Sequence, residues 1–170
     1  MTMRRLIEED VNLIIEEIKS KITGVLANVR SVRTDHKVNV DPPRSYFIYP
    51  NASGYKTPAI FVIGDNMSFR QAEKGANHIA ALSRVNVTCL VEEKTSELCT
   101  IKCFRYLSAL HEILDMTNLV SADSKVKIIV RVSDADNSAI YTNTDNKADM
   151  KAVFRKEVYL TCDVEHFENF

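Results

Sequence analysis

The chain is poor in glycine and lacks long hydrophobic runs, and each absence excludes a class of protein. Its 170 residues include only four glycines, Gly24, Gly54, Gly64 and Gly75. They are too far apart to form a glycine-rich loop around a phosphate, so P-loop and dinucleotide-binding fingerprints are absent. No segment approaches the roughly 18 consecutive apolar residues that a membrane-spanning helix requires. The N-terminal sequence MTMRRLIEED turns acidic without an apolar core, so we expect no secretory signal.

A strong charge of one sign is also missing. The chain carries 22 Lys and Arg against 23 Asp and Glu, which gives a net charge of −1. This balance argues against a general nucleic-acid-binding protein. Hydrophobic residues make up 45% of the chain, which is typical of globular proteins, and the length suits one domain with its own core. We therefore expect a single domain over residues 1–170 that folds without a disulfide framework or a metal.

Hydrophobic periodicity predicts two main helices. Apolar residues recur at steps of three and four over residues 3–31, and glutamate and lysine fill the other face. A second helix should begin at Thr95 or Ser96, either of which can cap its N-terminus, and end near Asp115. Its apolar stripe includes Cys99 and Cys103.

Four segments have the residue pattern of strands: 58–64, 78–93, 126–132 and 153–165. Segment 58–64 is apolar on both faces, which predicts a central strand. Shorter extended pieces are expected within 34–57 and at 139–141. Strands that follow one another in sequence usually pair antiparallel. The predicted fold class is therefore α+β, a two-layer sandwich with two main helices on one face of a mostly antiparallel four- to five-stranded sheet.

Three polar segments, 34–57, 64–78 and 134–150, are longer than ordinary connections, and such loops are often functional. In the second, Ser68 to Gln71 has the spacing of a capping box, which predicts one helical turn. Within the first of these segments, 34–57, Tyr46, Phe47 and Tyr49 form a short aromatic run. Exposed aromatic residues often mark an interface. The alternative is that these residues pack on the chain's own sheet, and both interpretations stay open.

Sites for chemistry are few. Cys99 and Cys103 lie one helical turn apart, but the sequence has no C-x-x-C pair, so we interpret the cysteines as core residues. Residues 134–138 resemble the start of a calcium loop, but Ala139 replaces the required glycine, so we expect a solvated acidic turn. The histidines have no sequence neighbours that would complete a triad. A small cytoplasmic enzyme with Cys99, Cys103 and His111 in its site is the remaining catalytic hypothesis.

The order of elements resembles a known family. A long N-terminal helix is followed by PAIFVIGD, by an extended SRVNVTCLVEE strand that leads into the helix SELCTIKCFRYLSALHEILD, and by the closing strand VFRKEVYLTCDVEHFE. This order, over roughly residues 3–165, is similar to that of the tail-terminator and tail-completion proteins of tailed bacteriophages and of neck proteins that share their fold. The resemblance depends on element order and contains no catalytic motif.

The resemblance implies a structural protein of the virion, assembled in the host cytoplasm, with no enzymatic activity and no cofactor. Such proteins form a ring, commonly of six copies, at the head-proximal end of the tail, where it stops growth of the tail tube. The implied partners are further copies of the chain, the major tail tube protein, a head-completion, connector or neck protein and, in a contractile tail, the sheath. No membrane and no specific nucleic-acid binding are implied, although DNA can pass through the ring. A head-to-tail connector or neck ring of the same machine is the alternative.

Loop position suggests which residues would meet these partners. The predicted interface residues are Tyr46, Phe47, Tyr49, Tyr55, Phe69, Arg70, Lys74, Asp134 and Asp136.

Overall fold

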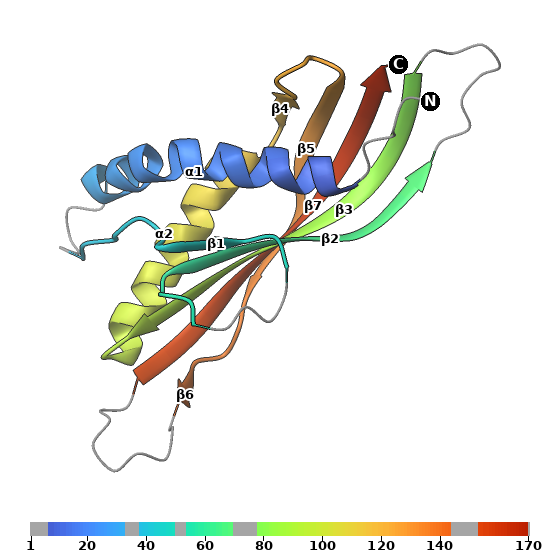
Figure 1. Cartoon of the computed structure of the whole chain (residues 1–170). Helices are drawn as coiled ribbons and strands as arrows, with labels where there is room; N and C mark the ends of the chain where they lie inside the picture. Colours follow the sequence, from blue (N-terminus) through green and yellow to red (C-terminus); the bar gives the residue numbers. More distant parts are fainter. Residues whose placement is uncertain (1–6, 33–37, 50–53, 70–77, 144–152, 170) are drawn as a thin grey trace.

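The computed structural model describes residues 7–32, 38–49, 54–69, 78–143 and 153–169. Two helices, α1 (Ile7–Val32) and α2 (Ser96–Leu114), lie on one face of a curved sheet (Figure 1). The described residues form seven strands: β1 (Ser45–Phe47), β2 (Ala59–Phe69), β3 (His78–Glu93), β4 (Thr117–Val120), β5 (Val126–Asn137), β6 (Tyr141–Asn143) and β7 (Val153–Asn169). Neither helix contains an apolar stretch long enough to cross a bilayer.

The sheet has the strand order β1-β2-β3-β7-β5-β4, and β6 pairs with β7 beyond the end of β5. All pairs are antiparallel except β1 and β2, which are parallel. The expected antiparallel pairs 58–64 with 78–93 and 126–132 with 153–165 are confirmed. Segment 58–64 was expected to be central, which is wrong, because β3 and β7 form the middle of the sheet and β2 lies next to an edge.

The α+β class is confirmed, but the two-layer sandwich of four to five strands is wrong. The sheet is mixed, has more strands, and curls into a half-barrel around the helices (Figure 1). Its two central strands pair over their whole length, from His78 with Asn169 to Glu93 with Phe154. Long paired strands accumulate twist, and bulges in β2 and β5 increase it locally, so the sheet cannot stay flat.

Two predicted loops are partly strand. β2 continues to Phe69, so the capping box at Ser68 is wrong for the described residues 68 and 69. β5 continues to Asn137, so the expected acidic turn at 134–137 is also wrong. The rest of these loops, 70–77 and 144–150, lies outside the described residues. Strand β4 was not expected, because four residues are too few to show a period.

The core lies between the helices and the inner face of the sheet. Even-numbered residues of β7 face inward from Lys156 to Glu168, and odd-numbered residues of β3 do so from Ala81 to Val91. Thr95 caps α2, as expected, because its side chain accepts a hydrogen bond from the Leu98 N–H at 3.3 Å. Buried apolar residues of both helices complete the core: Val11, Ile14, Ile15, Ile18, Ile22, Leu26, Cys99, Cys103, Tyr106, Ala109, Leu110, Ile113 and Leu114.

A polar cluster is buried where the first turns of α1 meet the sheet. The Asp10 carboxylate accepts a hydrogen bond from Ser83 Oγ at 2.7 Å and lies 2.5 Å from His166 Nδ1. All three side chains are buried. Next to them, Gly64 on β2 lets α1 approach closely, because a Cβ at this position would come within 2.6 Å of Ile7 Cδ1.

Candidate interaction surface

The outer face of the sheet, which faces away from α1 and α2, is not covered by any described helix. Register pairs define one cross-strand row on this face: Phe47, Phe61, Thr88, Tyr159 and Asp136. The next row contains Ile63, Asn86, Thr161 and Asp134. The two rows are apolar at the β1–β2 side and acidic at the β5 side. A sheet face of this kind can receive another protein over several strands at once.

Four aromatic rings form a cluster at the β1–β2 side of the outer face. We define the aromatic cluster as Phe47, Tyr49, Tyr55 and Phe61. The Phe47 ring stacks on Phe61 with 5.3 Å between centroids, and Tyr49 and Tyr55 meet Phe47 edge to face at 5.6 and 6.3 Å. Tyr49 is 54% exposed, although tyrosine has a large apolar ring. Large aromatic rings supply contact area at low entropic cost, so they are common in protein interfaces.

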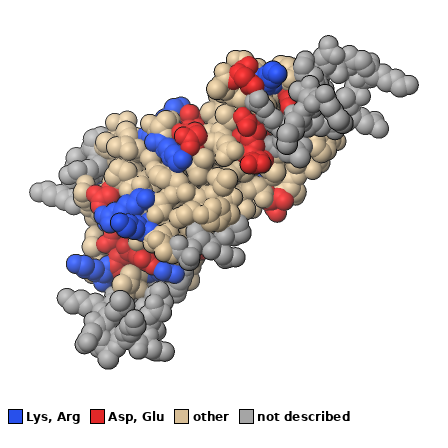
Figure 2. Space-filling view, viewed as in Figure 1, with Lys and Arg blue, Asp and Glu red and all other residues tan. Residues whose placement is uncertain are grey.

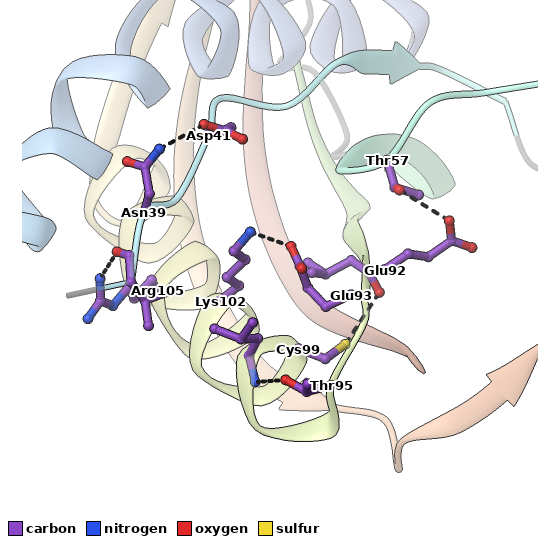
Figure 3. Close-up of polar contacts among 12 residues, drawn as sticks. Asn39, Asp41, Thr57, Glu92, Glu93, Thr95, Cys99, Lys102 and Arg105 are labelled. Atoms are coloured by element: carbon purple, nitrogen blue, oxygen red, sulfur yellow. Dashed lines mark hydrogen bonds and ion pairs between the residues drawn. The ribbon is translucent and has the colours of Figure 1, made fainter. Parts of the chain in front are cut away.

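The segment that carries Phe47 and Tyr49 is held in place by α2. Arg105, which is buried, donates a hydrogen bond from Nη1 to the carbonyl oxygen of Val38 at 2.7 Å. The next residue, Tyr106, donates its hydroxyl hydrogen bond to the carbonyl oxygen of Asp41. Burial raises the pKa of Tyr106, so this hydroxyl stays protonated as a donor. These bonds hold residues 38 and 41, which precede the aromatic cluster in the chain, against α2, and Figure 3 shows Arg105 beside this segment.

Ion pairs between β3, α2 and β7 support the same end of the sheet. Lys102 on α2 pairs with Glu93, and Arg155 on β7 pairs with Glu92. Glu92 also accepts a hydrogen bond from Thr57 Oγ1 at 3.1 Å, which ties residue 57 to β3. Figure 3 shows Glu93 extending toward Lys102 and Glu92 extending toward Thr57. These side chains are only partly exposed, so the network is less screened than a surface pair.

Charged side chains of both signs lie together on the face drawn in Figure 2. On the face drawn in Figure 2, blue and red side chains lie next to one another, most densely at the lower left. On α1, Lys19 pairs with Glu16, and Lys21 pairs with Glu17. Local pairing of this kind leaves little net field for a charged partner.

The structure brings some of the predicted interface residues together and separates others. Phe47, Tyr49 and Tyr55 meet in the aromatic cluster, and Asp134 and Asp136 lie on the same outer face across the sheet.

Two further predicted residues lie on the inner face. Tyr46 pairs with Ile60 and packs against the core, with Lys19 Nζ 5.7 Å from its ring centroid. Phe69 lies at the far end of β2 and is 55% exposed. Arg70 and Lys74 lie outside the described residues.

Sequence reasoning missed Phe61 as a surface residue. Its segment was interpreted as buried on both faces because Ile60 and Val62 alternate with Phe61 and Ile63. In the structure Ile60 and Val62 are buried, whereas Phe61 and Ile63 are only half-buried on the outer face. The sequence did contain a signal for this exposure. It predicts two helices on one face of the sheet, which leaves the other face, with Phe61 and Ile63, without a covering helix.

The residues of the catalytic hypothesis do not form a site. Cys99 and Cys103 are buried on the inner side of α2, and their thiols face backbone carbonyls, with Cys103 Sγ 3.7 Å from the Lys156 oxygen. His111 is on the exposed side of the same helix. The hydrogen bond from Cys103 lowers the pKa of Cys99, but a buried sulfur offers no access to a substrate. The described residues contain no group of three or more His, Cys, Asp or Glu placed to hold a metal ion.

No protein-family model and no curated protein matches the chain. Among solved structures, the chain is similar to one from the virion of a native gene transfer agent particle, at 14% identity and a TM-score of 0.39, over 91% of this chain and 93% of that chain. A second solved protein matches at 15% identity and a TM-score of 0.33, over 88% of this chain and 94% of that one. Both TM-scores are below 0.5, so neither likeness assigns a role to this chain.

Proposed function

We propose that this protein is a structural component of a tailed-phage virion, and that its copies form a ring at the head-proximal end of the tail. The observation that carries the proposal is the uncovered outer face, with an aromatic cluster at one side and exposed aspartates at the other. In this proposal the ring ends growth of the tail tube and joins the tail to the head or neck. The order of helices and strands, which is similar to that of tail terminators, supports this role.

The geometry suits a ring subunit because the two sides of the outer face differ. A ring forms when one patch of a subunit binds a different patch of the next and the rotation between them closes. The aromatic cluster and the aspartates of β5 are different patches on one rigid sheet, and they are separated by β3 and β7. Arg105 and Tyr106 hold residues 38 and 41 against α2, and pairing of β1 with β2 places Phe47 beside Phe61, which lowers the entropic cost of association.

Light scattering after size exclusion, together with negative-stain microscopy, tests the proposal. We expect the purified protein to form a discrete ring, alone or when added to tail tubes. The variant Tyr49→Ser should weaken assembly, because it removes an exposed ring from the cluster. The matched control is Phe104→Ser, which removes an aromatic ring that is 50% exposed on α2, outside the cluster. A protein that stays monomeric at all concentrations and never binds tubes would contradict the proposal.

A further inference from the structure

The exposed charges of β5 change sign along the strand. Lys125, immediately before the strand, and Lys127 are exposed at one end, and Asp134 and Asp136 are exposed at the other. We define these four residues as the β5 charge strip. Seven residues at about 3.3 Å each put roughly 20 Å between Lys127 and Asp134. This distance exceeds the Debye length of about 8 Å at physiological salt, so the two ends do not neutralise each other within one copy.

A β-bulge puts both ends of the strip on the same face. Lys127 and Arg131 pair with Phe167 and Asp163, odd-numbered residues of β7 that face outward. Side chains alternate along a strand, so an even-numbered aspartate would face inward if β5 were regular. The register shift between Val132 and Asp134 adds one residue, and Asp134 and Asp136 therefore pair with the outward Thr161 and Tyr159. Bulges that redirect side chains are common at functional surfaces.

The strip makes no ion pair within the described chain. Asp134 and Asp136 each accept a hydrogen bond from the N–H of the following residue, at 2.9 and 2.7 Å, and neither pairs with a Lys or Arg among the described residues. Arg131, between the two ends, is already paired with Glu165 at 3.6 Å. Among the described residues, the strip therefore keeps two lysines and two aspartates that form no ion pair, all on the outer face.

We propose that the β5 charge strip orients neighbouring copies of this chain, with the lysine end of one copy against the aspartate end of the next. The inference rests on the proposed self-assembly and names the surface that directs it. A second copy fits because the strip is complementary to itself, whereas nucleic acid or an anionic lipid would be repelled by the aspartate end. Asp136 shares a cross-strand row with Phe61 and Phe47, so contact at the strip is continuous with the aromatic cluster.

Exposed charges of this kind set the direction and rate of association more than its strength. The apolar rings of the outer face would supply most of the affinity, and the strip would select the correct rotation between copies. Self-association should therefore weaken as NaCl rises from 50 to 500 mM, because salt screens the strip.

Charge-swapped pairs of variants test this arrangement. The double variant Asp134→Lys/Asp136→Lys makes the strip entirely basic, and Lys125→Asp/Lys127→Asp makes it entirely acidic. Each variant alone should associate about tenfold more weakly than the wild type, whereas an equimolar mixture should recover association, because basic and acidic copies can alternate around a ring. Analytical ultracentrifugation measures the association constants. Circular dichroism tests whether each variant folds. If the lysine variant does not fold, Asp134→Asn/Asp136→Asn replaces it as the variant that lacks the two negative charges, and it should also associate more weakly than the wild type.

The matched control is Glu97→Lys/Glu112→Lys, which changes the net charge of the chain by the same amount on the exposed side of α2. We expect this control to associate like the wild type. Charge-swapped variants that associate normally would overturn the role of the strip while leaving the proposed ring intact. Variants that weaken association without recovery in the mixture would also overturn it and would indicate a different partner. A wild-type protein that never self-associates would instead overturn the proposed function.

Discussion

His166 Nδ1 lies 2.5 Å from Asp10 Oδ1, although the two residues are 156 positions apart in the sequence. The contact joins the first turns of α1 to the last strand of the sheet. A carboxylate has two accepting oxygens, so the Asp10 side chain meets His166 Nδ1 with Oδ1 and Ser83 Oγ with Oδ2 at once. His166 Nε2 faces Glu168 Oε2 at 4.0 Å. The cluster therefore couples the position of α1 to the middle of the sheet.

Asp10→Asn should destabilise the fold by about 1–3 kcal/mol, because the amide nitrogen would present a donor to a donor in a buried site. Urea unfolding followed by circular dichroism measures the loss. The control Glu8→Gln changes an exposed carboxylate two residues earlier and should shift the free energy of unfolding by less than about 0.5 kcal/mol. Equal effects of the two substitutions would show that the buried contact contributes nothing specific.

Gly64 and Gly24 should respond to alanine in opposite directions. Gly64→Ala should destabilise the fold by about 1 kcal/mol, because the new Cβ meets the Ile7 side chain, with Cδ1 at 2.6 Å and Cγ1 at 2.7 Å. Gly24→Ala should stabilise it by about 0.5–1 kcal/mol, because nothing lies within 4 Å and alanine favours an exposed helix interior. In the Ile7→Ala background the cost of Gly64→Ala should shrink. If Gly64→Ala were equally destabilising in the Ile7→Ala background, the destabilisation would not come from contact with the Ile7 side chain.

Arg105→Ala should loosen the segment at residues 38–49. The carbonyl oxygen of Val38 would lose its donor, and the aromatic cluster would lose part of its support. We expect faster amide exchange in this segment and a loss of about 2 kcal/mol in the free energy of unfolding. The neighbouring control Phe104→Ala, on the exposed side of α2, should change neither quantity much. Unchanged exchange in Arg105→Ala would show that the Arg105 hydrogen bond does not hold this segment in place.

The cysteines should be inert in the folded protein. All four thiols are buried and free, and burial raises the pKa of Cys162 to about 12. Thiolate is the reactive form, so a thiol reagent at pH 8 should react with none of them quickly and with all of them in 6 M guanidinium. Ser108→Cys places a thiol on the exposed side of α2 and is the positive control. A rapidly reacting native thiol would show that the inner side of α2 opens to solvent.

Local patterns predicted the two helices, an N-cap at Thr95 or Ser96 and the approximate positions of the four longer strands. These features depend on residues within a few positions of one another. The strand order did not follow from them, because pairing of β3 with β7 joins segments that are separated by α2, β4 and β5. The predicted interface residues were chosen by loop position, so Tyr46 was grouped with Phe47 although the two face opposite sides of the sheet.

The sequence by itself determined the two helices and the positions of the four longer strands, and it excluded nucleotide-binding loops, because periodicity and glycine spacing are local properties of the chain. Only the tertiary structure decided which face each side chain occupies. One added residue in β5 moves Asp134 and Asp136 to the outer face, and one pairing between distant residues buries Asp10 against His166. Side-chain alternation has a period of two, so a single-residue shift in register reverses the face, and no local pattern records that shift.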